Sequence, residues 1–351
     1  MMIKRYLIIL CLASLYIMCN TAMANKVITH ETFENGFSDY WYRAMNNYTY
    51  SGNPSTNYSV SPSHSYRFEL HNTDASFEDG IRSELEGPAE PPLQERIYNF
   101  SIYLPEGGTE DYTIDAPGAG EVIVQWHNNP DEGEEWTRPP LALFTDTYDN
   151  GTGYYFLQRI WDQDPISTNE KLESEGKVIK YDLGSYEGDK GRWINWSFRI
   201  KWGWLESQNS KLEVFKDGKM ILNLDGLPNT TNDTKGVNQQ FGMYKWSWNE
   251  RDISAGSKLT SRVIYFDDVT VTQVNNLTIP IFPGCTNIPT DPDNNGLYED
   301  INGNGEIDFN DDTTYYDNVE WIESNAPVAL FDYNSNEVID FDDVIKLYNI
   351  V

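Results

Sequence analysis

The sequence predicts an all-β fold, a concanavalin-like jelly-roll sandwich, followed by a small α-helical domain. Residues 26–273 alternate apolar and polar side chains with a period of two, between frequent turn residues. This pattern is typical of antiparallel strands. Helical periodicity is nearly absent there. After a proline-rich stretch at residues 275–290, the composition becomes acidic and asparagine-rich, and apolar stretches of helical type follow at residues 315–322 and 344–351.

The first 24 residues have the pattern of a secretory signal. A basic pair precedes an apolar run at residues 6–18, and Ala22-Met23-Ala24 supplies the small residues of a cleavage site. The run is shorter than the roughly 20 apolar residues of a transmembrane helix. We therefore expect a secreted mature chain that begins near Asn25. Lipidation of Cys19 is an alternative route to the cell surface, but Met18 is an unusual residue before a lipidated cysteine.

Residues 25–274 are expected to form one large domain of stacked sheets. The clearest strand has alternate apolar residues that point one way, namely Ile194, Trp196, Phe198, Ile200 and Trp202. Residues 211–225 predict a hairpin with its tight turn at Asp217-Gly218, and residues 262–272 predict the last strand. So many strands must close their sheets against each other to bury apolar faces and protect edges. A jelly roll is the favoured solution.

The net charge argues against two classes of partner. The chain has a formal charge of −30, and residues 279–351 hold 16 acidic residues against a single lysine. Nucleic acids and anionic membranes are bound mainly through Lys and Arg, so neither is expected as a partner. An acidic substrate would need a locally basic cleft, for which the candidates are Arg82, Lys245, Arg199 and Lys201. Outside the signal, Cys285 is the single cysteine, so no intrachain disulfide is expected.

The C-terminal domain, residues 291–351, contains two copies of a calcium-loop pattern that start 32 residues apart. Each copy places oxygen-bearing side chains at loop positions 1, 3, 5, 9 and 12, and position 7 ligates through its carbonyl oxygen. Calcium prefers about six to eight oxygen ligands, so we expect Ca²⁺ as the cofactor of this domain. The expected ligands are Asp300, Asn302, Asn304, Glu306, Asp308 and Asp311 in the first loop, and Asp332, Asn334, Asn336, Val338, Asp340 and Asp343 in the second.

This domain resembles a type I dockerin, the duplicated calcium-loop module that attaches secreted carbohydrate-active enzymes to cohesin domains. Position 12 is Asp in dockerins, as at Asp311 and Asp343. The resemblance implies a cohesin-like protein partner. Position 6 is Gly305 in the first loop but Glu337 in the second, and a side chain there disfavours the sharp turn, so the second loop should bind calcium more weakly. Residues 291–296 could form a third, partial site. A disordered acidic tail is the alternative interpretation.

Three short strings in the large domain contain the residues expected to do chemistry. They are Arg82-Ser83-Glu84-Leu85, Gln125-Trp126-His127 and Gly242-Met243-Tyr244-Lys245. Side chains two positions apart on a strand share one face of the sheet. Together the strings supply a cation, an amide, an imidazole and a phenol. That set suits β-elimination on an acidic polysaccharide, in which a base removes the C5 proton of a uronic acid while the neighbouring carboxylate is neutralised.

Each group has an expected role in that reaction. Arg82 and Gln125 would neutralise the carboxylate, and His127 would act as the base because an imidazole titrates near neutral pH. Tyr244 would protonate the leaving glycosidic oxygen, or act as the base if neighbouring cations lower its pKa. The residues expected to bind substrate are Glu84, Lys245, Trp246 and Trp248.

The strings resemble those of the jelly-roll polysaccharide lyases, a group that includes alginate, glucuronan and heparin-I-type lyases. Alginate lyases of this architecture have Arg-(Ser/Thr)-Glu-(Leu/Val)-Arg, Gln-(Ile/Val)-His and Lys-Ala-Gly-x-Tyr segments. Here Glu86 replaces the second arginine, Trp126 the aliphatic residue and Gln240-Phe241 the Lys-Ala pair. The resemblance implies cleavage of a uronic-acid-containing polysaccharide, with tyrosine as the acid and histidine or tyrosine as the base. The departures argue against alginate, and Lys245 fits the glucuronan or heparin-lyase branch better.

Two other functions compete with elimination. A retaining glycoside hydrolase on the same fold needs two carboxylates roughly 5 Å apart, but a Glu-x-Asp-x-x-Glu motif is absent, and Glu84 and Glu213 would pair only by accident of the fold. A non-catalytic carbohydrate-binding or adhesin sandwich could use the 11 tryptophans and 23 tyrosines as stacking platforms. Most of those aromatic residues are assigned to the core by the alternation.

Overall fold

The computed structural model describes residues 25–77, 80–249, 256–274, 281–292, 297–334, 336 and 338–351. The predicted signal at residues 1–24 therefore lies outside the described residues. So do residues 293–296 of the possible third calcium site, and Glu337 of the second loop.

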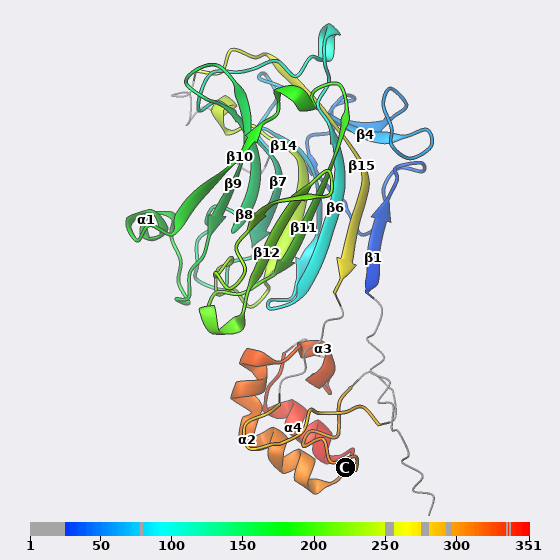
Figure 1. Ribbon diagram of the computed structural model, residues 1–351, viewed down its shortest axis with the longest axis vertical. Coiled ribbons are helices and arrows are strands. Elements are labelled where there is room, and N and C mark those ends of the chain that lie inside the picture. The colour runs from blue at the N-terminus through cyan, green and yellow to red at the C-terminus, as the bar shows by residue number, and fades with distance from the viewer. Residues whose placement is uncertain are drawn as a thin grey trace, which may run out of the picture.

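Two antiparallel sheets form the large domain (Figure 1). One sheet consists of β1 (Lys26–Glu31), β3 (Gly52–Ser55), β4 (Ser65–His71), β6 (Glu95–Tyr103), β11 (Trp193–Lys201), β12 (Lys211–Lys216), β13 (Lys219–Asn223) and β15 (Ser261–Gln273). Its order is β13-β12-β11-β6-β15-β4-β3, and β1 also pairs with β15.

The second sheet consists of β2 (Tyr42–Met45), β5 (Arg82–Glu90), β7 (Glu121–Asn128), β8 (Leu141–Thr147), β9 (Gly153–Ile160), β10 (Val178–Ser185) and β14 (Val237–Tyr244). Its order is β10-β9-β8-β7-β14-β5-β2. A short helix, α1 (Asn169–Ser174), which the sequence did not predict, precedes β10. The 3-10 helices are η1 (Gly108–Glu110), η2 (Glu187–Asp189), η3 (Glu206–Gln208) and η4 (Trp246–Trp248). The predicted two-sheet β-sandwich is confirmed.

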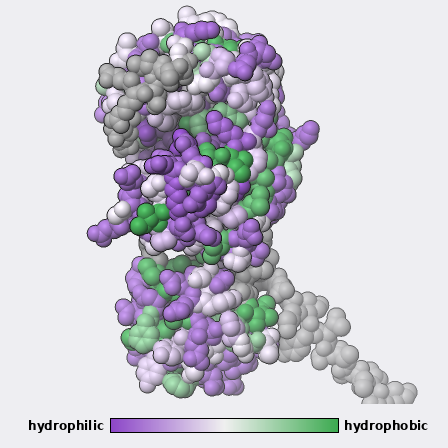
Figure 2. All heavy atoms as spheres, turned by 90° about the vertical axis from the view of Figure 1, so that its left-hand side faces the viewer, coloured by the Kyte–Doolittle hydropathy of each residue, from purple (hydrophilic) through white to green (hydrophobic). Residues whose placement is uncertain are grey.

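The core lies between the two sheets and is built largely from aromatic rings. On β11 the residues predicted to face inward are fully buried, and Phe198 lies 5.7 Å from Phe100 of its own sheet and 4.9 Å from Trp126 of the other sheet, between ring centroids. Burial of apolar surface stabilises a fold by roughly 25 cal/mol per Å². Figure 2 shows hydrophilic residues over most of the face drawn there, with hydrophobic residues in small separate groups.

The predicted hairpin and last strand are also confirmed. β12 and β13 pair in antiparallel register, and the turn between them has φ 50° at Asp217 and φ 74° at Gly218. Positive φ at both central positions defines the tight turn that matches strand twist, which favours Asp-Gly. The last strand is β15.

The C-terminal domain contains α2 (Phe309–Asn325), α3 (Val328–Phe331) and α4 (Phe341–Tyr348) around a small core. Asp308 and Asp340 cap the N-termini of α2 and α4 with their side chains. Phe282 is 1% exposed in this core, so part of the stretch that the sequence assigned to a linker, residues 275–290, belongs to this domain. Among the described residues, no helix is long and apolar enough to cross a membrane.

Candidate active site

The three strings lie on neighbouring strands of the seven-stranded sheet, in the order β7-β14-β5. Tyr244 is opposite Arg82, and Gln240 is opposite both Gln125 and Glu86. Asn238 is opposite His127. The alternate residues of these strands, Leu85, Trp126 and Phe241, are fully buried in the core. The structure therefore places Arg82, Gln125, His127 and Tyr244 on the outer face of one sheet.

The glycine of the third string has a structural cause. Gly242 has φ 135°, and a Cβ atom there would lie 2.3 Å from the carbonyl oxygen of Ser83 on β5. Glycine alone adopts this conformation without strain. Its place between Gln240 and Tyr244 lets β14 pack closely against the strand that presents Arg82.

A buried carboxylate organises the middle of the face. Glu84 is fully buried, and its Oε1 atom accepts a hydrogen bond of 2.8 Å from Gln125 Nε2, while Oε2 lies 3.7 Å from Arg82 Nη1. Gln125 Nε2 also donates to Gln240 Oε1 at 2.8 Å. The prediction that Glu84 binds substrate is therefore wrong, because its side chain is covered and occupied by protein partners. Gln125, 2% exposed, donates its amide protons to Glu84 and Gln240. Its predicted role in neutralising the substrate carboxylate is therefore corrected to holding Glu84 in place.

His127 is half-buried, and the charge that acts on it is that of Arg82. Its Nδ1 atom lies 3.1 Å from the carbonyl oxygen of Asn128, and its ring centroid lies 5.1 Å from that of Trp136. Burial and, to a smaller extent, the charge of Arg82 together lower the pKa of His127 to about 4, against the hydrogen bond to Asn128, which raises it. The imidazole is therefore neutral at neutral pH. With the proton on Nδ1 donated to the carbonyl, Nε2 can accept a proton.

Tyr244 is held by groups on both sides. The Arg82 Cζ atom lies 4.8 Å from the centre of its ring, and Asn249 Nδ2 donates to its hydroxyl at 3.1 Å. Asn249 Oδ1 accepts a hydrogen bond of 3.0 Å from the backbone N–H of Ile81. Asn249 thus ties the phenol to the strand of Arg82. Sequence reasoning did not find Asn249, since nothing in the local pattern marks it.

The prediction that Lys245 binds substrate is wrong. This lysine is fully buried, and its Nζ atom pairs with Asp115 at 2.9 Å and Glu121 at 2.8 Å. Glu121 also pairs with Arg262 at 2.8 Å. Successive residues of an extended strand point to opposite faces, so the residue after Tyr244 points away from the site. Lys245 does not reach substrate, and it anchors the end of β14.

Of the two tryptophans predicted to bind substrate, one lies on the outer face and the other belongs to the core. Trp246 is half-buried on the outer face, with its ring 5.4 Å from Phe144, and remains available to a ligand. Trp248 packs against the main core and donates from Nε1 to Ser257 at 2.9 Å, which makes it structural. The ring of Phe156, in the same aromatic cluster as Trp246, lies with its centre 4.7 Å from Nζ of Lys180 on β10.

The two other basic residues predicted to line a substrate cleft do not lie on the face of the strings. Arg199 and Lys201 are on β11, in the sheet opposite the strings, and Arg199 pairs with Glu95 at 2.5 Å. Glu213 is on β12 of that same sheet. The pair of Glu84 and Glu213 that a hydrolase would need is therefore not assembled.

Comparison with known protein families identifies the family of this chain. The sequence matches the family described as polysaccharide lyase over residues 33–270. The chain belongs to that family. The protein is a polysaccharide lyase, and the matched residues lie within the sandwich, which we call the lyase domain.

Several solved structures are similar to this lyase at low sequence identity. An endo-β-1,4-glucuronan lyase from the fungus Trichoderma reesei is 16% identical with a TM-score of 0.50, over 67% of this chain and 95% of that one. The alginate lyase AlyC3 is 12% identical with a TM-score of 0.42, over 60% and 75%. An alginate lyase from Aplysia kurodai is 14% identical with a TM-score of 0.39, over 64% and 87%. No curated protein matches the sequence.

The two predicted calcium loops have the same internal hydrogen bonds. The backbone N–H of Asn302 donates to Asp311 at 3.0 Å, as that of Asn334 donates to Asp343 at 3.1 Å. The backbone N–H of Asn304 likewise donates to Asp300 at 2.9 Å, and that of Asn336 to Asp332 at 3.1 Å. Both loops therefore curl around the carboxylates at positions 1 and 12.

The donor set of the loops decides which metal they fit. Within the described ranges, no three His, Cys, Asp or Glu side chains form a metal-binding group. A site here would therefore depend on asparagine and backbone carbonyl oxygens in addition to carboxylates. Such all-oxygen sets suit calcium rather than zinc or copper.

Proposed function

We propose that the lyase domain cleaves a uronic-acid-containing polysaccharide by β-elimination. The observation that carries the proposal is the neutral imidazole of His127 on the same sheet face as the Tyr244 phenol and the Arg82 guanidinium. Base, acid and cation are the three groups that elimination next to a carboxylate requires.

In this mechanism the substrate carboxylate lies against Arg82. Removal of the C5 proton moves negative charge onto that carboxylate, so the guanidinium interaction is stronger in the transition state than in the ground state. His127 Nε2 takes the proton, and Tyr244 donates one to the glycosidic oxygen as the bond to C4 breaks. Gln125 and Glu84 act as positioning residues, because they hold the guanidinium through the contact of 3.7 Å.

The proposed function is tested by measuring ultraviolet absorbance, because elimination creates a C4–C5 double bond that is conjugated to the carboxyl group and absorbs there. Purified protein is incubated with polyglucuronate, alginate, heparin and pectate. We expect absorbance to rise on polyglucuronate, because Glu86 and Gln240-Phe241 depart from the alginate-lyase pattern. Reducing ends that accumulate without absorbance would indicate hydrolysis and contradict the proposal.

The pH profile of kcat/KM is expected to have its acid limb near pH 4. The base must be unprotonated, and the pKa of His127 is lowered to about 4 by burial and by the Arg82 charge. Activity should therefore persist through pH 5 and 6 and fall about tenfold per pH unit below the pKa. Arg82→Met should shift the limb to higher pH in addition to lowering the rate. A limb at the ordinary histidine value, near 6.5, would contradict the assignment.

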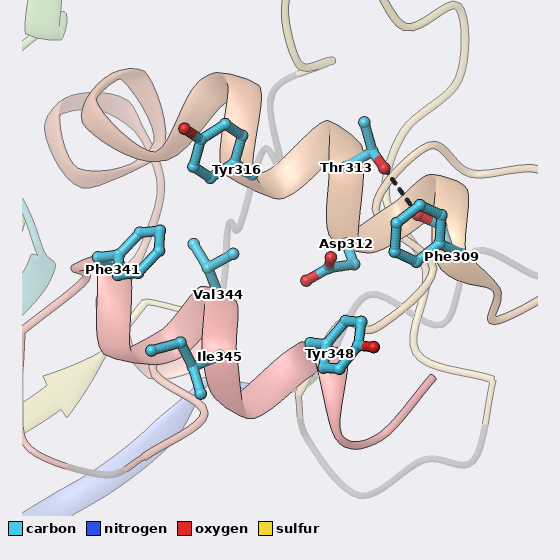
Figure 3. A pocket seen from close by; sticks show the side chains of 8 residues that line it. All are labelled: Phe309, Asp312, Thr313, Tyr316, Phe341, Val344, Ile345 and Tyr348. Atoms are coloured by element: carbon cyan, nitrogen blue, oxygen red, sulfur yellow. Dashed lines mark hydrogen bonds between the residues drawn. The ribbon is translucent and has the colours of Figure 1, made fainter.

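We propose that the C-terminal domain is a dockerin-like calcium module that binds a cohesin-like protein. Its support is a repeated aromatic surface beside the repeated loops. Phe309 and Tyr316 on α2 recur 32 positions later as Phe341 and Tyr348 on α4, and each is more than half exposed. Phe309 pairs with Tyr348 at 6.2 Å and Tyr316 with Phe341 at 5.9 Å between ring centroids (Figure 3).

Calcium removal is expected to act on this module alone. Metal binding supplies folding free energy to the domain that holds the ion. Chelator should therefore expose residues 297–351 to protease and leave the lyase domain resistant. Asp300→Ala should abolish the tighter of two calcium-binding events in calorimetry, and Asp332→Ala the weaker. Protection of the C-terminal segment in chelator, equal to that in calcium, would refute the calcium proposal.

We infer that residues 1–24 direct secretion, which would bring the lyase to extracellular polysaccharide. Mass spectrometry of protein exported by a host is expected to find an N-terminus near Asn25.

A further inference from the structure

A polar depression lies on the outer face of the other sheet, away from the strings. It has a volume of about 180 Å³ and is lined by Asn99, Phe100, Ser101, Asn195, Trp196, Ser197, Gly218 and Asp268. Phe100 and Trp196 are buried in the core, so the side chains that line it are almost all small and polar. None of them contributes to the proposed elimination.

The floor of the depression is an array of two amides and two hydroxyls. β6 and β11 are neighbouring strands (Figure 1) and pair in antiparallel register. In that register Asn195 lies opposite Ser101, and Ser197 lies opposite Asn99. This register places amides and hydroxyls diagonally across four adjacent positions of one sheet face.

The array keeps hydrogen-bonding capacity for a ligand. Ser101 Oγ donates to Asn195 Oδ1 at 2.6 Å, and Asn99 Nδ2 donates to Thr270 Oγ1 at 3.0 Å. In the part of the chain that the structure describes, Asn195 Nδ2, Asn99 Oδ1 and the Ser197 hydroxyl have no hydrogen-bond partner. Donors and acceptors that alternate over a few ångströms match sugar hydroxyls, which donate and accept in the same way.

An aromatic wall adjoins the array. Trp193 is two positions before Asn195 on β11 and shares its face. It is half-buried, with its ring 5.5 Å from Tyr103, which Tyr58 covers at 4.1 Å. Flat rings of this kind present large apolar area at low entropic cost to the C–H face of a sugar. The volume is below the roughly 300 Å³ of a drug-sized site, so the depression accommodates one sugar unit.

The charge of the lining selects the class of glycan. Asp268 is the one charged residue among the eight that line the depression, and its carboxylate lies 3.4 Å from His30 Nε2. No lysine or arginine lines it, in contrast to the face that presents Arg82. A uronate carboxylate would meet the carboxylate of Asp268 there. Arg192, whose partner Asp217 accepts from the backbone N–H of Asn195, is already paired with Asp189 at 2.7 Å and Asp217 at 2.8 Å.

We propose that this depression is a second, non-catalytic binding site for a neutral, hydroxyl-rich glycan. One sugar unit hydrogen-bonds to Asn195, Ser197 and Asn99, and the next stacks on Trp193. Because the site lies on the opposite sheet from the strings, it holds the enzyme on a neutral polymer while the other face remains open to the uronate chain.

The test is affinity electrophoresis of the full-length protein in gels that contain one polymer each. The neutral probes are hydroxyethyl cellulose, galactomannan and laminarin, and the acidic probes are polyglucuronate and alginate. At least one neutral probe is expected to retard the wild type. Asn195→Ala/Ser197→Ala should weaken that binding about tenfold, since two hydrogen bonds are lost, and Trp193→Ala should weaken it as well. Asn223→Ala, an exposed asparagine on β13 of the same sheet, is the matched control.

Three results of the electrophoresis would overturn the proposal. If no neutral probe retards the wild type, or if the double variant binds as tightly as the wild type, the proposal is wrong. It is also wrong if the double variant loses affinity for polyglucuronate instead. Asn195→Asp, an isosteric change at an exposed position, should weaken neutral binding too and guards against misfolding of the double variant. Lyase activity on soluble uronate oligosaccharides should be unchanged in both variants.

Discussion

His127→Ala and Tyr244→Phe are each expected to lower kcat on a uronate polymer at least about a hundredfold. General base and general acid groups typically contribute about 10² to 10⁴ in rate. His127→Ala removes the neutral imidazole, and Tyr244→Phe removes only the hydroxyl that Asn249 contacts at 3.1 Å. Initial rates of double-bond formation at saturating substrate measure the effect.

Folding must be kept apart from chemistry in that experiment. His71→Ala is a suitable control, since His71 is a half-buried histidine on β4 of the opposite sheet that pairs with Glu69 at 2.7 Å. Thermal unfolding of the lyase domain should be similar in all three variants. Near-normal kcat in both His127→Ala and Tyr244→Phe would remove these residues from the reaction.

Lys245→Met is expected to destabilise the lyase domain by about 3 to 5 kcal/mol. The change leaves Asp115 and Glu121 buried around a side chain that no longer carries charge, and removal of one partner from a buried ion pair typically costs this much. At present burial raises the pKa of Glu121, but the Arg262 and Lys245 charges outweigh burial and keep it below its ordinary value. The free energy of unfolding in urea measures the loss.

The same network predicts how stability depends on pH. A carboxyl group whose pKa is lower in the folded state stabilises the fold above its unfolded pKa, and that contribution is lost as pH falls. Asp115 and Glu121 both have lowered pKa values, so stability should decline below about pH 4 in the wild type.

The control for Lys245→Met is Lys219→Met, at an exposed position on β13, which should leave the free energy of unfolding nearly unchanged. A similar, small change in Lys245→Met would show that the buried lysine is dispensable.

Local patterns in the sequence predicted much of the candidate site. The alternation in Arg82-Ser83-Glu84 and in Gln125-Trp126-His127 determines which side chains share a face, because the strand period is two. The duplicated spacing of aspartates and asparagines predicted the two loops, and the structure adds that Asp308 and Asp340 cap α2 and α4. The family match over residues 33–270 confirms the lyase interpretation.

Other features depended on partners distant in the chain. Arg199 has the same local pattern as Arg82, yet it lies on the opposite sheet, because nothing in a strand's own residues states which sheet it joins. The sequence predicts that Glu84 binds substrate, but in the fold Gln125 and Arg82 contact its carboxylate and it is fully buried. Asn249 is far from Ile81 in sequence, and only the folded chain brings them within 3.0 Å.

By itself, the sequence determined the sandwich, the duplicated loops and the set of candidate reactive side chains, since periodicity and spacing are local properties of a chain. The tertiary structure decided that β7, β14 and β5 are neighbours, that Lys245 points inward, and that burial together with Arg82 keeps the imidazole of His127 neutral. Strand order and desolvation are set by contacts between residues far apart in the chain, so no stretch of sequence encodes them alone.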